Sequence, residues 1–285
     1  MIKSFARGLS DHIITKVHSN EKLLTKFVCP IYCESPTPRL SHIGSGVLLQ
    51  IGESKFILTA AHVLDHRSEG TLCIPGDGLL IPINGTFRST DIPKGRARED
   101  DKVDIGFCRL DDQTVNAIAS YSYLPATEII ADEKPVFGRL YSFIGYPNTR
   151  NEVRYKIRPN PFSFLNTPLT IDLYSQYKLD TNIHIAVKYD KKRTVSANHK
   201  PISFPDPHGL SGGGLWAWEI RDRFKVGNPE VSPKLVGITT GYTTDKKAWF
   251  ATKIGIALEC VRTTFQDLDQ FIPRITSLNV NVTIR

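Results

Sequence analysis

Three residues, far apart along the chain, have the types that nucleophilic catalysis requires. Ser211 lies in the glycine-rich segment 209–214, GLSGGG. Glycine lets the backbone adopt positive φ and turn two N–H groups toward one oxygen. His62 ends the segment 56–62, FILTAAH, in which an apolar run is followed by two small residues. Asp104 opens a further apolar run. An imidazole at the end of one strand and a carboxylate at the start of another can be held rigidly together.

These residue types match the parts that acyl transfer to water needs: a nucleophile, a base, a group that orients the base, and donors for the oxyanion. We predict that Ser211 is the nucleophile, that His62 is the general base and that Asp104 orients the imidazole. The oxyanion donors would be the N–H groups of Gly209 and Ser211. Each residue alone also fits a structural role, but their joint occurrence favours catalysis. The rival residues, expected to shape loops or face solvent, are His66, His208, Asp100 and Asp101.

Short runs rich in β-branched and aromatic residues recur between Gly, Pro and Asn residues, which predicts a mostly antiparallel β protein. The expected strands cover 27–32, 46–50, 55–59, 104–110, 141–145, 183–189 and 235–240. Gly52-Glu53-Ser54 separates two of them, and Asn84-Gly85 is the dipeptide favoured in a tight hairpin turn. Consecutive hairpins of this kind build barrels or sandwiches.

Helical periodicity is confined to the two ends of the chain. Ile254, Leu258, Val261 and Phe265 follow one another at helical spacing and form one apolar face. We therefore expect a C-terminal helix packed on the β core. The first two dozen residues mix isoleucine, valine and leucine with polar residues, which predicts a short amphipathic helix that leads into the first strand.

The composition is that of a globular protein, since the 285 residues are 40% hydrophobic and 23% charged. No apolar run reaches the roughly 18 residues of a transmembrane helix, so we expect no membrane span and no membrane partner. The five cysteines lack the spacing of a disulfide framework or a zinc site. Together with an N-terminus that lacks a secretory apolar region, they predict a cytoplasmic protein with buried thiols and no metal.

The net charge is +7, and one basic cluster consists of Lys188, Lys191, Lys192, Arg193 and Lys200. Polar residues surround this cluster, which is typical of a solvated loop. A nucleic-acid site would need interleaved aromatic residues or a known binding motif, and the cluster has neither. We expect no nucleic-acid partner, whereas an acidic protein partner stays open.

The ordered motifs resemble those of trypsin/chymotrypsin-like serine peptidases. Three motifs carry the likeness: TAAH at 59–62, DIG at 104–106 and GLSGG at 209–213. Their order of His, Asp and Ser distinguishes this family among the triad enzymes. Supporting matches are GSGVL at 44–48, GYP at 145–147 and LVGI at 235–238. The resemblance extends over residues 24–270.

The resemblance implies an all-β fold of two antiparallel six-stranded β-barrels with a C-terminal helix and a short N-terminal extension. Residues 1–22 would form the extension, 23–130 the first barrel, 131–272 the second barrel with its helix, and 273–285 a tail. His62 and Asp104 would come from the first barrel and Ser211 from the second, with the cleft between them. The residues that would border this cleft and pair with substrate backbone are Thr239, Thr240 and Gly241.

Leu210 departs from the family pattern, because secreted members carry an aspartate there that pairs with a newly cleaved N-terminal ammonium. We expect Leu210 to pack in an apolar pocket, and we do not expect activation by N-terminal insertion. The floor of the specificity pocket would lie near 204–206. There Asp206 either selects basic side chains or, as we favour, lies in a solvent-facing turn.

The predicted function is hydrolysis of peptide bonds in a protein or peptide substrate through an acyl-enzyme, with no cofactor. Unrestrained proteolysis would harm a cytoplasm, so we expect narrow specificity or control by a regulatory protein partner. The alternative is a catalytically silent pseudoprotease that acts as a protein-binding module. The intact set of His62, Asp104 and Ser211 argues against that alternative.

Overall fold

The computed structural model describes most of the chain, with residues 2–11 and Arg221 described by their backbone alone. The described residues are 2–36, 40–92, 94–136, 138–151, 157, 159–189, 205–221, 230–243, 245, 247–272, 274–275, 280 and 282–285. Of the predicted basic cluster, only Lys188 falls within them.

The first sheet is built from strands between residues 28 and 125 and is antiparallel apart from one short pair. Its strands are β1 (Val28–Glu34), β2 (Leu40–Ile51), β3 (Ser54–Ala60), β4 (Thr71–Pro75), β5 (Leu80–Pro82), β6 (Gly85–Ser89), β7 (Ile105–Leu110) and β8 (Leu124–Pro125). They run in the order β5-β4-β1-β2-β3-β7-β6, and β8 pairs in parallel with β2. The sheet has eight strands where six were expected, because β5 adds a hairpin to β4 and β8 adds a short edge pair.

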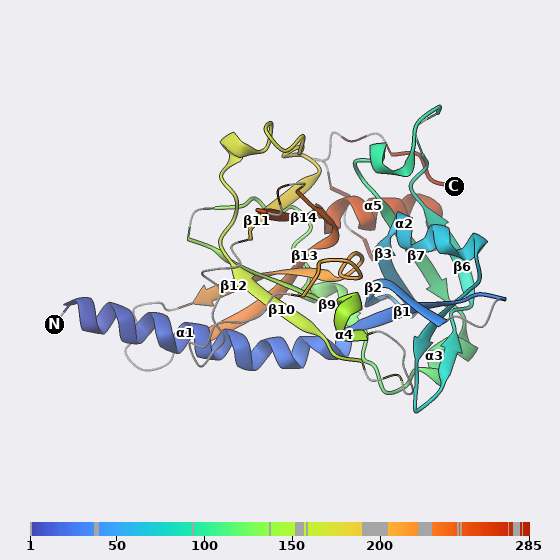
Figure 1. The fold of residues 1–285 in the computed structure, drawn as a ribbon, viewed down its shortest axis with the longest axis horizontal. Helices are drawn as coiled ribbons and strands as arrows, with labels where there is room; N and C mark the ends of the chain where they lie inside the picture. The colour runs from blue at the N-terminus through green and yellow to red at the C-terminus, as the bar shows by residue number, and fades with distance from the viewer. Residues whose placement is uncertain are drawn as a thin grey trace.

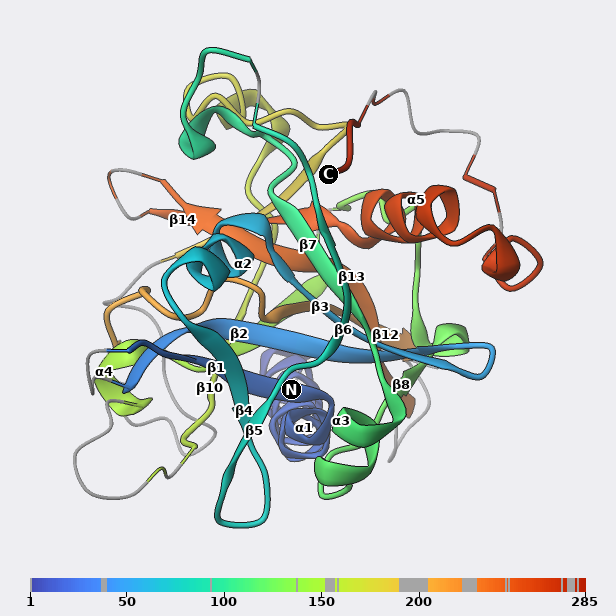
Figure 2. The same cartoon turned by 90° about the vertical axis from the view of Figure 1, so that its right-hand side faces the viewer.

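The second sheet has six strands, the number predicted, and is antiparallel throughout. Its strands are β9 (Leu140–Gly145), β10 (Phe162–Asn166), β11 (His184–Lys188), β12 (Gly214–Arg221), β13 (Glu230–Tyr242) and β14 (Ala248–Lys253). Their order is β10-β9-β12-β13-β14-β11. The two curled sheets lie beside each other in Figure 1, and in Figure 2 the first sheet faces the viewer.

The hairpin predicted at Asn84-Gly85 is wrong. The flanking strands β5 and β6 lie at opposite edges of the sheet, since β5 pairs with β4 and β6 pairs with β7. Gly85 adopts φ 140, and a Cβ there would lie 2.0 Å from the carbonyl oxygen of Arg109. The glycine is therefore required by close packing of two strands and not by a two-residue turn.

Five α-helices occur in the described residues: α1 (Ile2–Leu24), α2 (Ala61–Asp65), α3 (Asp112–Ala117), α4 (Asn148–Asn151) and α5 (Ile254–Thr264). Short 3-10 helices cover Thr25–Phe27, His66–Ser68, Arg98–Asp100, Ala126–Glu128, Ile171–Leu173 and Gln266–Leu268. The prediction of α5 is confirmed, and it contacts β7 of the first sheet as well as β13 and β14 of the second. None of the described helices is long and apolar enough to cross a membrane.

The N-terminal helix α1 is longer than the short helix predicted, with 23 residues, and it extends away from the sheets in Figure 1. Glu21 anchors its C-terminal half. The Glu21 carboxylate is buried and accepts hydrogen bonds from Ser142 of β9 at 2.5 Å and from Ser163 of β10 at 3.0 Å. Val17 and Leu24 on the same helix join the main hydrophobic core.

One hydrophobic core spans both sheets and fixes how they pack. It contains Leu49 and Phe56 from the first sheet, Leu235 and Ile238 from the second, and Val261 from α5. Further apolar clusters lie within each sheet. All five cysteines are free and buried, as predicted. Because close-packed interiors resist deformation, loops that project from the two sheets are held in a defined relation to each other.

Candidate active site

His62 and Asp104 meet where β3 gives way to α2. The strand ends at Ala60, and His62 lies in the first turn of the short helix. Its Nδ1 lies 2.6 Å from Asp104 Oδ2, and its backbone N–H donates to Asp104 Oδ1 at 2.9 Å. The backbone N–H of Ala61 donates to the Asp104 carbonyl at 3.0 Å. Asp104 adopts φ 46, an uncommon conformation for a residue other than glycine, and these hydrogen bonds hold it there.

The environment of this pair favours a proton on the imidazole. Burial disfavours the charged form of His62, but the hydrogen bond and charge of Asp104, together with the charge of Asp65, outweigh burial, so the pKa of His62 is raised. Burial raises the pKa of the Asp104 carboxyl, and the hydrogen bond and charge of His62 oppose that rise. Asp104 is 8% exposed. The pair is therefore a hydrogen-bonded unit whose carboxylate is shielded from water, whereas the imidazole is 36% exposed.

Ser211 lies between two glycines that adopt positive φ, Gly209 at 90 and Gly212 at 85. The N–H of Gly212 donates to the Thr239 carbonyl at 2.7 Å. A Cβ at Gly212 would lie 1.9 Å from the carbonyl oxygen of Ser45. Only glycine combines this dihedral angle with this close approach, which explains the glycine-rich sequence around the serine.

The two amides predicted to bind an oxyanion are oriented through their own peptide planes. The carbonyl of His208 accepts from the Asn148 N–H at 2.8 Å, and the carbonyl of Leu210 accepts from the Gly213 N–H at 3.0 Å. In a trans peptide the N–H points away from the C=O of the same unit. The N–H groups of Gly209 and Ser211 are thereby directed away from these anchors, and within the described part of the chain neither donates to another group.

A residue that the sequence prediction did not assign, Ser45 on β2, holds this loop from the first sheet. Its hydroxyl donates to the Gly209 carbonyl and accepts from the Tyr146 N–H, each at 2.8 Å. Its backbone N–H donates to the Ser211 carbonyl at 2.8 Å. The GSG motif that contains Ser45 supported the resemblance, and this was the signal that could have identified its role.

The proposed catalytic residues share one cleft. His62, Asp104 and Ser211 all line a cleft of about 500 Å³ between the two sheets. No hydrogen bond joins the Ser211 hydroxyl to His62 among the described residues. Catalytic hydrogen bonds are often long without substrate and tighten in the substrate complex. The structure thus brings the nucleophile and the base to the same cleft without the contact that proton transfer requires.

Two of the three predicted cleft residues also line this cleft. Thr240 and Gly241 do so, whereas Thr239 is buried and its carbonyl accepts from Gly212. Strand β12 pairs with β13 only as far as Ile238, and a register shift falls between Thr239 and Gly241. The β12 side of Thr240 and Gly241 is therefore not covered by a strand in the described residues, which leaves an edge that an extended peptide can join.

Leu210 is 3% exposed and belongs to the apolar cluster of the second sheet with Phe143 and Trp249. Its predicted packing is confirmed. Asp206 does not line the cleft. Its Oδ1 accepts from the His208 N–H at 3.1 Å within the same turn, in agreement with the reading we favoured.

The rival residues lie outside the strands and α-helices, and His66 and Asp100 belong to short 3-10 helices. His66 pairs with Glu69 at 2.9 Å, and Asp100 accepts from the Ala97 N–H at 3.3 Å. His208 lines the cleft, with its side chain 67% exposed. Asp101 differs from the others, because its side chain is only 6% exposed and is paired with Arg98.

Comparison with known proteins supports the fold. No family model matches the chain, and no curated protein matches it in sequence. A similar solved structure is neuropsin, described as a serine protease expressed in the limbic system of mouse brain. It has a TM-score of 0.53 and 16% sequence identity, and the match covers 84% of this chain and 94% of that chain. Two curled antiparallel sheets, few helices and a C-terminal helix define a chymotrypsin-like fold.

Proposed function

We propose that this protein is a serine endopeptidase whose triad is His62, Asp104 and Ser211. The observation that carries the proposal is the hydrogen-bonded His62–Asp104 pair in the same cleft as a serine whose neighbouring amides have fixed directions. Each of the four parts of acyl-transfer chemistry has a residue in this cleft.

In the proposed reaction, the Ser211 hydroxyl attacks a peptide carbonyl while His62 takes its proton. Asp104 accepts the Nδ1–H hydrogen bond and fixes the tautomer that leaves Nε2 free to act as base. The oxyanion that forms is stabilised by the amides of Gly209 and Ser211. His62 then returns the proton to the leaving amine, and water hydrolyses the acyl-enzyme by the same steps.

The substrate class follows from the uncovered edge of β13. A chain that pairs with Thr240 and Gly241 must be extended, so we propose a peptide or an exposed protein loop as substrate. Asp206 is engaged in its own turn, and we assign no preference for basic residues to it.

A serine-reactive fluorophosphonate probe tests the proposal without knowledge of the substrate. We expect purified protein to gain one probe adduct by intact mass, and Ser211→Ala and His62→Ala to lose it. Ser120→Ala removes an exposed serine that neither lines the cleft nor adjoins a residue that lines it, and it should label like the wild type. Absence of labelling in the wild type, or labelling that survives Ser211→Ala, would contradict the proposal, and the first result would favour the pseudoprotease alternative.

A further inference from the structure

Arg98, the first residue of a short 3-10 helix, makes four hydrogen bonds through its guanidinium. Its side chain is 12% exposed, and its Nε and Nη2 donate to the two oxygens of Asp65 at 2.7 and 3.1 Å. Its Nη1 donates to Asp101 Oδ2 and to the Thr90 carbonyl, each at 2.9 Å. A guanidinium held in this bidentate way has a fixed orientation. Arg98 also lines the cleft, but each of its three guanidinium nitrogens donates to another group of the protein.

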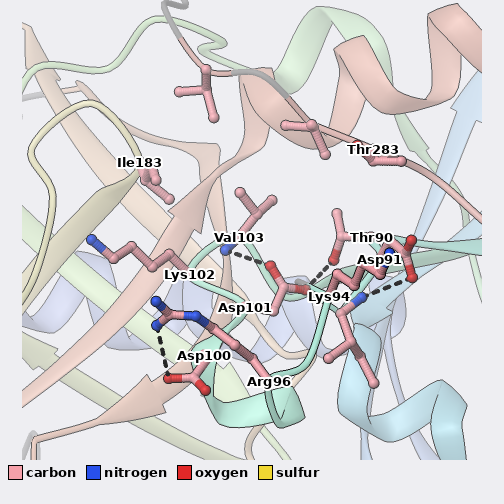
Figure 3. A pocket seen from close by; sticks show the side chains of 13 residues that line it. Thr90, Asp91, Lys94, Arg96, Asp100, Asp101, Lys102, Val103, Ile183 and Thr283 are labelled. Atoms are coloured by element: carbon pink, nitrogen blue, oxygen red, sulfur yellow. Dashed lines mark hydrogen bonds and ion pairs between the residues drawn. The ribbon is translucent and has the colours of Figure 1, made fainter.

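The two carboxylates that hold Arg98 belong to the elements that carry His62 and Asp104. Asp65 is the last residue of α2, one helical turn after His62. Asp101 precedes Asp104 by three residues, and its Oδ1 accepts from the Val103 N–H at 3.0 Å. Figure 3 shows Asp101 between Val103 and Thr90, whose hydroxyl donates to it. Arg98 therefore links the helix of the base to the loop of the orienting acid.

The C-terminal segment also contacts this network. Its backbone extends the first sheet beyond β6, where Ser89 and Arg285 exchange hydrogen bonds at 3.2 and 3.0 Å and the Asp91 N–H donates to the Thr283 carbonyl at 2.9 Å. The Arg285 guanidinium donates to Asp65 Oδ1 at 2.7 Å. Thr283 is seen beside this loop in Figure 3. Asp65 is thus held by two arginines, and both donate to its Oδ1.

We propose that Arg98 is a positioning residue that holds His62 and Asp104 in register through Asp65 and Asp101, and that Arg285 of the C-terminal segment braces this network. The inference rests on the proposed function, because it assigns these residues to the geometry of the same pair. It also gives the C-terminal segment a role, which its sequence alone did not indicate.

The network acts on His62 through charge as well as through position, and this provides a readout that a purely structural role would not move. Asp65 raises the pKa of His62, whereas Arg98 lowers it. The charged or titratable groups that line the cleft around His62 are Arg98, Glu99, Asp101, Lys102, Asp104, Tyr177, Lys178, His184, His208 and Tyr242. Removing Asp65 or Arg98 leaves the others in place, so the two substitutions should move the pKa of His62 in opposite directions.

The test measures the pKa of His62 by NMR titration of its ring protons, assigned with His62→Gln, and the rate of fluorophosphonate labelling at pH 7.5. We expect Asp65→Asn to lower the pKa of His62 and Arg98→Gln to raise it. Arg98→Gln should label about 10–100-fold more slowly, since small displacements of catalytic groups have effects of this size. Arg98→Lys keeps the charge but not the bidentate contact, so its His62 pKa should stay near wild type while labelling remains slow.

Arg285→Gln removes a more exposed ion pair, and we expect labelling to slow by about twofold to fivefold. The matched control is Arg96→Gln, because Arg96 lies in the same loop and forms an exposed pair with Asp100 at 3.9 Å. It should match wild type in both measurements. If Arg98→Gln does not fold, Arg98→Lys and Arg285→Gln decide the question.

Two results would overturn the inference: folded Arg98 variants that label at the wild-type rate, or a His62 pKa that does not respond to Asp65→Asn and Arg98→Gln. The titration also separates this inference from the proposed function. A wild-type protein that takes no probe would contradict the proposed function, yet its His62 pKa would still report whether Asp65 and Arg98 act on the imidazole.

Discussion

The hydroxyl of Ser45 fixes the predicted oxyanion loop from the first sheet, and Ser45→Ala tests its role. The hydroxyl lies in a fully buried residue and bonds both the Gly209 carbonyl and the Tyr146 N–H. Deleting it leaves two buried backbone groups without partners, and each such group costs about 1–3 kcal/mol. We therefore expect the free energy of unfolding to fall by about 2–6 kcal/mol, unless the loop rearranges.

A rearrangement of the loop has a catalytic consequence. If the Gly209–Leu210 peptide rotates to find another donor, the neighbouring Gly209 amide turns away from the cleft. Loss of one oxyanion donor typically lowers kcat by about 10²–10³. We expect Ser45→Ala to show an intermediate drop in kcat, about 10–100-fold, because the Ser45 backbone N–H still holds the Ser211 carbonyl.

The assay is hydrolysis of a fluorogenic peptide, with the fraction of competent protein set by fluorophosphonate titration. Ser142→Ala is the matched control. Ser142 is also fully buried and its hydroxyl also makes two hydrogen bonds, to Glu21 and Trp218, but it does not line the cleft. Ser142→Ala should lose stability with kcat unchanged. A folded Ser45→Ala protein with wild-type kcat would refute the reasoning.

Three further predictions concern the residues packed around this loop. Burial lowers the pKa of His42 from 6.5 to about 4. The unfolded chain therefore binds the proton more tightly than the folded protein, and the free energy of unfolding should fall by about 3 kcal/mol as the pH drops from 6.5 to 4. Urea unfolding at both pH values should show a smaller loss for His42→Gln than for the wild type. Leu210→Asp places a carboxylate in an apolar cluster and should lower the unfolding free energy by about 3 kcal/mol or more, against less than about 1.5 kcal/mol for Leu210→Met, as measured by thermal denaturation. Gly212→Ala cannot keep both its φ and its approach to Ser45, so probe labelling should be lost.

The strands and the C-terminal helix could be predicted because their signals are local. All seven predicted strands correspond to observed ones, and the spacing of Ile254, Leu258 and Val261 places them together on α5. The order of the motifs likewise predicted that His62, Asp104 and Ser211 lie at one cleft, and all three line the same cleft in the structure. These features depend on a few neighbouring residues, which is the range over which periodicity and motifs carry information.

Other features depend on pairings that no local pattern encodes. Asn84-Gly85 has a hairpin signal, but each flanking strand gains more by pairing elsewhere in the sheet, and tertiary context overrides the dipeptide. The network around Asp65 joins it to Arg98 across 33 residues and to Arg285 across 220. Arginine and aspartate in exposed-looking segments predict only solvated loops. Their partnership becomes visible only when the sheet brings the segments together.

The contacts between the two sheets explain why the site depends on both at once. Ser45 of the first sheet holds the loop of Ser211, which leads into the second sheet. In return, Thr252 of the second sheet donates to the Val103 carbonyl at 2.7 Å, and His184 Nε2 lies 2.8 Å from the Lys102 carbonyl, just before Asp104. The loops that carry Asp104 and Ser211 are thus each fixed by the opposite sheet. A change that loosens the packing between the sheets should therefore disturb the oxyanion loop and the His62–Asp104 pair together, whereas a change within one sheet should leave one of them in place.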